Sequence, residues 1–74
     1  MAIRTNGAAI RALRQAYGWK ITKFALANGV SPSYMSNLEA GRRQASPEVL
    51  RKISETLGVP LAAITSEHDV QDVA

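Results

Sequence analysis

Two short helical segments separated by only three residues, Gly29-Val30-Ser31, restrict the possible folds of this chain more than any other feature. The first segment covers residues 20–28 and ends at Asn28-Gly29, where glycine tolerates the positive φ that a sharp turn requires. The second covers residues 32–40 and begins with Ser31-Pro32, a serine N-cap followed by proline at the first helical position. Because the connection is so short, the two helices must cross at a steep angle, as in a helix-turn-helix.

Apolar residues recur at helical spacing through the rest of the chain, and we find no alternating pattern that predicts a strand. Further helices are predicted at residues 7–17, 47–57 and 60–66, the first with Thr5 or Asn6 as N-cap, so the fold class is all-α, a compact five-helix domain. Residues 1–66 are expected to form this domain, and residues 67–74 a flexible acidic tail. The predicted inner faces consist of apolar residues, namely Ile10, Leu13, Tyr17, Trp19, Phe24, Ala25, Val30, Met35, Leu38, Leu50, Ile53, Leu57, Leu61 and Ile64.

The charge is distributed unevenly along the 74 residues, whose formal net charge is +3. All nine Lys and Arg residues lie between Arg4 and Lys52, whereas half of the six acids lie within residues 67–74. A basic body suggests a polyanionic partner, most often nucleic acid, although many small domains are basic without binding DNA.

Several other classes of protein are disfavoured by composition. The absence of cysteine excludes disulfides and thiolate metal sites, and His68 between Glu67 and Asp69 is expected to be solvated rather than a metal ligand. The chain has no pair of carboxylates in an apolar segment and no glycine-rich phosphate loop, so we predict neither an enzyme nor a cofactor. No apolar run suits a membrane span or a signal peptide, which leads us to expect a soluble, cytoplasmic protein.

The second helix of the pair carries an unusual polar face. Ser33, Ser36 and Asn37 are short side chains and poor helix formers, whereas an ordinary surface helix usually carries Glu and Lys. A helix that enters the major groove of DNA, about 12 Å wide, needs such a slim face. This pattern favours a DNA-recognition helix over a plain surface helix.

The segment from Gly29 to Arg43 resembles the core of the phage-repressor family of helix-turn-helix proteins, the Cro/repressor-like, xenobiotic-response-element class. Residues 10–14 resemble the first helix of that family, and residues 50–59 its fourth helix, so the resemblance covers residues 7–65. It implies a five-helix lambda-repressor-like domain that regulates transcription by binding double-stranded DNA, as a repressor of phage or bacterial type. It also implies that the N-terminal part of the third helix contacts base edges.

The resemblance and the residue types together identify candidate DNA contacts. Five residues of the third helix and the loop after it are the candidates for contacts with base edges: Asn37, Ser33, Tyr34, Pro32 and Arg43. For phosphate contacts we expect cationic or hydroxyl side chains: Lys20, Lys23, Ser31, Ser36 and Arg42. For Tyr34 the alternative is a partly buried flank, for Asn37 an exposed helix end, and for each cation a solvated charge.

Two residues are predicted to be structural, and two positions depart from the family pattern. In the family, the arginine at Arg14 and the glutamate at Glu39 usually form a partly buried salt bridge between helices. Where this chain has Ile21, the family usually has a glutamine that reaches toward the DNA backbone, and the neighbouring Lys20 is the candidate to replace that contact. Pro32 stands where relatives often carry a polar residue, so it offers only an apolar contact.

The resemblance also implies partners. A homodimer would pair through the predicted fifth helix and the C-terminal segment, but Leu61 and Ile64 are also needed for the core, so a monomer on an asymmetric site stays open. The same domain occurs as a protein-interaction module, such as an antitoxin or a targeting domain, and this is the alternative function.

Overall fold

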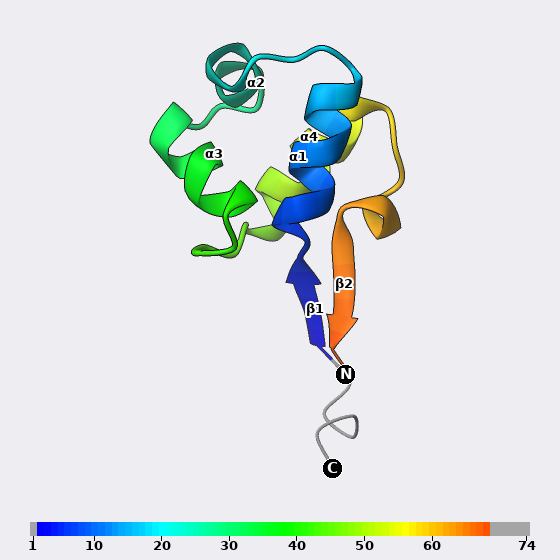
Figure 1. The fold of residues 1–74 in the computed structure, drawn as a ribbon. Helices are drawn as coiled ribbons and strands as arrows, with labels where there is room; N and C mark the ends of the chain where they lie inside the picture. Colours follow the sequence, from blue (N-terminus) through cyan, green and yellow to red (C-terminus); the bar gives the residue numbers. More distant parts are fainter. Residues whose placement is uncertain (1, 69–74) are drawn as a thin grey trace.

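The computed structural model describes residues 2–68, and within them four α-helices surround one core beside a small sheet (Figure 1). The helices and the 3₁₀ turn η1 are α1 Gly7–Ala16, α2 Ile21–Ala27, α3 Pro32–Glu39, α4 Pro47–Leu57 and η1 Leu61–Ala63. The sheet consists of β1, Ala2–Thr5, and β2, Thr65–His68, which pair antiparallel. In Figure 1 the two strands project from the helices on the side away from α2.

The four helices lie within one or two residues of the predicted ranges because their ends are set by local signals. Ser31 Oγ accepts a hydrogen bond from Tyr34 N at 3.0 Å at the start of α3. Asn6 and Ser46 cap α1 and α4 in the same way, and Gly58 ends α4 in the left-handed conformation with φ 69°.

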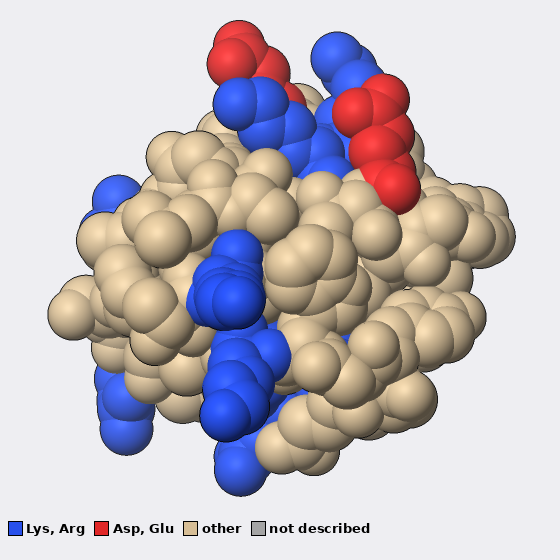
Figure 2. Space-filling model, turned by 90° about the horizontal axis from the view of Figure 1, so that it is seen from above, with Lys and Arg blue, Asp and Glu red and all other residues tan. Residues whose placement is uncertain are grey.

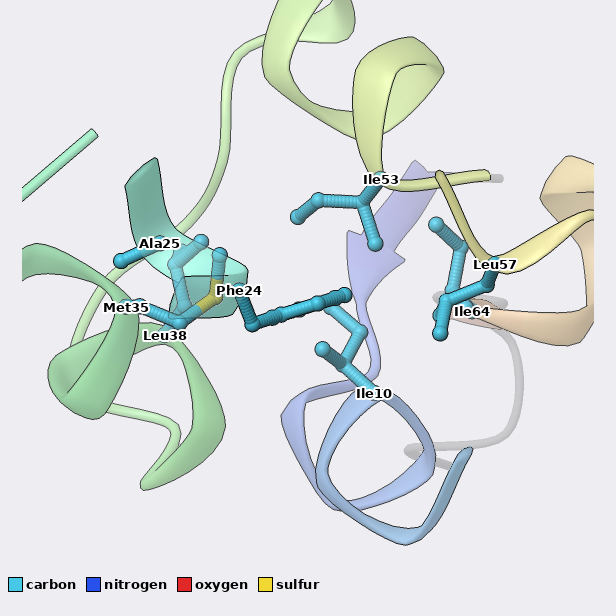
Figure 3. Close-up of a cluster of buried hydrophobic side chains, with 8 residues drawn as sticks. All are labelled: Ile10, Phe24, Ala25, Met35, Leu38, Ile53, Leu57 and Ile64. Atoms are coloured by element: carbon cyan, nitrogen blue, oxygen red, sulfur yellow. The ribbon is translucent and has the colours of Figure 1, made fainter. Parts of the chain in front are cut away.

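Eight apolar side chains form the buried core, and they come from every helix and from the residue after η1 (Figure 3). They are Ile10, Phe24, Ala25, Met35, Leu38, Ile53, Leu57 and Ile64. Figure 3 shows the Phe24 ring in the middle of the cluster, between Met35 and Leu38 on one side and Ile10 on the other. The core therefore fixes α2 and α3 against α1 and α4.

Gly7 allows α1 to start in contact with the end of α3. A Cβ built at Gly7 would lie 2.0 Å from the carbonyl oxygen of Leu38 and 2.8 Å from that of Glu39. Only glycine permits this approach of the two backbones. The predicted helix start did not indicate this contact, because it depends on a residue far along the chain.

The prediction that Tyr17 lies on the inner face of the first helix is wrong, because Tyr17 is 56% exposed. Helix α1 ends at Ala16, and the chain turns at Gly18, which has φ 78°. Trp19, predicted to pack on the core, does so and meets the Phe24 ring edge-on at a centroid distance of 5.7 Å.

The predicted all-α, five-helix fold is wrong at both ends of the described chain. In place of a helix over residues 60–66 the structure has only η1, followed by β2. The extended form is stabilised by partners from the other end of the chain: Asn6 N donates to Ile64 O at 2.9 Å, and Thr5 pairs with Thr65 in the sheet register. Ile64 is buried as predicted, but Leu61 is 44% exposed and does not belong to the core.

Strand β2 also crosses the predicted domain boundary at residue 66. Glu67 and His68 belong to this strand, so the predicted tail does not begin at residue 67. The part of the predicted tail at residues 69–74 lies outside the described residues.

Candidate nucleic-acid interface

The turn between α2 and α3 is held by a buried asparagine. Asn28 is 1% exposed, and its Nδ2 donates to Phe24 O at 2.7 Å, while its Oδ1 accepts from Thr56 Oγ1 at 2.8 Å. The bond from Thr56 links the turn to α4, the bond to Phe24 O closes the end of α2, and Gly29 with φ 73° reverses the chain. From the sequence alone, Asn28 is recognisable only as a helix end, because its partner Thr56 lies 28 residues away.

The face of α3 that points away from the core carries the predicted base contacts. Met35 and Leu38 are fully buried, whereas Pro32 and Ser33 are exposed. Asn37 is half-buried and stands one helical turn after Ser33. Its Oδ1 accepts a bond from Arg42 Nη1 at 3.3 Å, so the side chain stays at the surface with a cation beside it.

Tyr34 and Arg43 form a pair at the edge of this face. Tyr34 is half-buried and packs against the core, as expected for a partly buried flank, the alternative to a base contact. The Arg43 guanidinium lies over the Tyr34 ring, 4.6 Å from its centroid. The stacked ring holds this loop cation close to the exposed face of α3.

The five residues predicted to contact phosphates are all exposed, namely Lys20, Lys23, Ser31, Ser36 and Arg42. Ser31 Oγ is already the acceptor of the α3 cap, which leaves its O–H free to donate. Seen from above in Figure 2, Lys and Arg lie in the middle and lower part of the surface and also at its left and upper edges, whereas Asp and Glu lie only at the upper edge, beside some of these cations. The middle and lower part of this view shows cations without acids, which suits a polyanion.

Arg14 and Glu39 join α1 to α3 in a buried ion pair. Arg14 Nε donates to Glu39 Oε2 at 2.7 Å and Nη2 donates to Oε1 at 3.1 Å, with side-chain exposures of 10% and 5%. Arg14 Nη1 also donates to Trp19 O at 2.8 Å. The pair therefore braces α3 against α1 and the turn after it, and its burial makes it structural.

A polar cleft of about 290 Å³ opens next to this ion pair, and we call it the arginine cleft. It lies between α1, α2 and α3 and is lined by Arg11, Arg14, Ile21, Ser36, Glu39 and Arg42. Arg11 is not among the DNA contacts predicted from the sequence. Its spacing of three residues from Arg14 on the same helix face could have indicated it.

A second cleft, of about 400 Å³, is mainly apolar and lies between the sheet, the start of α4 and η1. We call it the apolar cleft, and its walls include Ile3, Leu50 and Leu61. Ile3 is 67% exposed, so with Leu61 it leaves considerable apolar surface in contact with solvent.

Within residues 2–68, no helix has both the length and the apolar character needed to cross a membrane. The same residues contain no group of three or more His, Asp or Glu side chains placed to hold a metal ion.

Comparisons with known proteins match most of the chain. A family model described as helix-turn-helix matches residues 10–64. An uncharacterized HTH-type transcriptional regulator of Mycobacterium tuberculosis, Rv0023, is 40% identical over 60 residues, which is 81% of this chain and 23% of that protein. The chain thus spans less than a quarter of the length of this relative.

Two solved structures have the same architecture. The clp gene regulator ClgR from Corynebacterium glutamicum superimposes with a TM-score of 0.73 at 41% identity, over 76% of this chain and 60% of the other. SinR, a master regulator for biofilm formation solved in complex with DNA, gives a TM-score of 0.72 at 29% identity, over 77% and 95% of the two chains.

Proposed function

Because this chain belongs to the helix-turn-helix family of Cro/repressor type, we propose that it binds a specific sequence of double-stranded DNA and represses transcription. The observation that carries the proposal is the exposed face of α3. Pro32 and Ser33 are open to solvent on a helix that Met35 and Leu38 anchor in the core. A slim polar helix on a rigid support is what entry into the major groove requires.

Asn37 and Ser33 are the proposed base contacts. The Asn37 amide pairs with N6 and N7 of adenine, a contact that discriminates between bases by about 1–3 kcal/mol. To make it, Asn37 releases its 3.3 Å bond with Arg42, whose guanidinium then turns to the backbone. Pro32 offers an apolar contact to a thymine methyl, and Tyr34 and Arg43 extend the contacts at the edge of α3.

The exposed cations and hydroxyls supply the proposed phosphate contacts: Lys20, Lys23, Ser31, Ser36 and Arg42. About five contacts in each of two half-sites give a slope of log affinity against log salt of about −9. Such a strong salt dependence is expected for both specific and non-specific duplex DNA.

We propose a homodimer that places two copies of α3 in successive major grooves, about 34 Å apart. The apolar cleft supports this pairing, because Leu61 is 44% exposed and is therefore not committed to the core of its own chain. Ile3, which also lines the cleft, adds a second exposed apolar side chain to a surface that two copies can share. Substituting Leu61 with Asp should leave a monomer in sedimentation analysis.

The test of the function is selection of bound sequences from a random duplex library with the purified chain. We expect a palindromic consensus, and Ser33→Ala and Asn37→Ala should each reduce preference for it, by about 5- to 150-fold for Asn37. Ser66→Ala, which removes an exposed hydroxyl from β2, is the matched control.

In transcription from a promoter that carries the selected site, the chain should lower the yield of transcript, and a higher yield would contradict repression. If no sequence is enriched and the chain binds a partner protein instead, the interaction-module alternative is correct. The apolar cleft is the surface that such a partner would cover.

A further inference from the structure

We propose that the arginine cleft binds one backbone phosphate of the duplex and that Arg11 of α1 is a DNA-contacting residue. This inference rests on the proposed function and extends the contact surface from α2 and α3 to α1. The ligand is a phosphodiester group of the strand that runs beside α3.

The charge of the cleft favours an anion. Three guanidinium groups line it, from Arg11, Arg14 and Arg42, and Glu39 is its one acid. Glu39 is already engaged by Arg14 through bonds of 2.7 and 3.1 Å. The charges of Arg11 and Arg42 are therefore not balanced by an acid lining the cleft, and an entering phosphate meets a net positive site.

The donors in the cleft suit a phosphate oxygen. Arg14 uses three of its five N–H groups for Glu39 and Trp19, and these bonds hold its guanidinium in place. Ser36 adds an exposed hydroxyl from α3, and Ile21 contributes no acceptor that would repel an anion. Arg11, exposed on the same face of α1 as Arg14, completes the cleft as a cation that can adjust its position.

The cleft is also in the right place for the DNA backbone. Arg42 lines it and at the same time contacts Asn37, the proposed base-contacting residue, through the 3.3 Å hydrogen bond. Ser36, the neighbour of Asn37 in sequence, lines the cleft as well. A helix in the major groove is flanked by phosphates on both sides, and the arginine cleft meets one such flank.

The experiment compares the full chain with Arg11→Gln on the duplex selected in the library, between about 50 and 200 mM salt. We expect Arg11→Gln to weaken binding about 3- to 10-fold at the lower salt concentration. The salt slope should fall in magnitude by about 0.9 per bound protomer, equally for the preferred and an unrelated duplex. Arg4→Gln, an exposed arginine of β1, is the control of equal charge and should change the slope far less.

Ethylation interference identifies the phosphate itself. Ethylation of the phosphate that lies in the cleft should weaken DNA binding by the wild-type chain. Ethylation of the same phosphate should not weaken DNA binding by Arg11→Gln any further. Thermal melting should show the same midpoint for both variants and the wild type, because Arg11 and Arg4 are exposed.

The outcomes separate this inference from the proposed function. If Arg11→Gln keeps the wild-type slope and ethylation pattern while Asn37→Ala loses sequence preference, the cleft assignment is wrong and the DNA-binding function stands. If the wild-type chain binds no duplex at all, the proposed function fails and the cleft assignment fails with it.

Discussion

Substituting Glu39 with Ala tests the physical basis of the α1–α3 brace directly. The Glu39 side chain is 5% exposed and accepts two bonds from Arg14, whose own side chain is 10% exposed. After the substitution, Arg14 keeps its positive charge in a buried position and retains only its bond to Trp19 O at 2.8 Å. The cost therefore comes mainly from the uncompensated charge rather than from the lost contact.

The expected loss of stability is large for a chain of this size. Breaking a buried ion pair by removing one partner costs about 3–5 kcal/mol. A domain of 74 residues has a total unfolding free energy of roughly 4–11 kcal/mol. Since 1 kcal/mol shifts the melting midpoint of so small a domain by about 4–8 °C, we expect Glu39→Ala to melt about 12–40 °C below the wild type.

A double-mutant cycle in urea unfolding distinguishes this cause from a general loss of packing. Arg14→Met and Glu39→Leu should each be strongly destabilising, whereas the double variant removes both charges and should be more stable than either single variant. Because the pair is buried, the coupling free energy should change little between 0.1 and 1 M salt, values that strongly alter exposed pairs. Single variants within about 1 kcal/mol of the wild type, with no coupling, would refute the buried-pair interpretation.

Three further substitutions probe contacts that position the helix-turn-helix. Gly7→Ala would place a Cβ 2.0 Å from Leu38 O, so the backbones of α1 and α3 must move apart. We expect the free energy of unfolding in urea to fall by about 1–3 kcal/mol or more. An unchanged urea midpoint would exclude the close approach of α1 and α3. Thr56→Val leaves the buried Asn28 Oδ1 without its donor and should cost about 1–3 kcal/mol, whereas Thr56→Ser should be nearly neutral; equal losses would show that the hydroxyl is unimportant. Ser31→Ala removes the α3 cap and should lower the free energy of unfolding by about 1 kcal/mol in thermal melting. Ser31→Asp supplies another capping oxygen and should keep most of the wild-type stability, whereas a Ser31→Ala variant as stable as the wild type would show that the cap contributes nothing.

The helices could be predicted from sequence because their ends depend on neighbouring residues. Ser31-Pro32 and Ser46-Pro47 place a capping oxygen three residues before the N–H that it binds, and Gly58 ends α4 by adopting a positive φ. Such contacts lie within one helical turn, so a short window of sequence contains both partners. The exposed polar face of α3 follows from the same periodicity, once Met35 and Leu38 are assigned to the core.

The strands could not be predicted, because each depends on the other end of the described chain. Residues 2–5 and 65–68 are four residues each and lack the alternation that indicates a half-buried strand. In isolation, residues 60–66 have apolar residues at helical spacing. The hydrogen bond from Asn6 N to Ile64 O and the pairing of residues 65–68 with β1 stabilise the extended form instead.

For the candidate site, the residue types were evident from the sequence, but their arrangement was not. The polar face of α3 and the basic loop after it are properties of consecutive residues, whereas the link between Asn28 and Thr56 joins positions 28 residues apart. The arginine cleft likewise needs Arg11 from α1 and Arg42 from the loop after α3 at one surface. Local hydrogen bonds and side-chain periodicity determined the helices of this protein. Only packing between distant segments decided which charges were buried, which became neighbours and where the ends of the described chain paired.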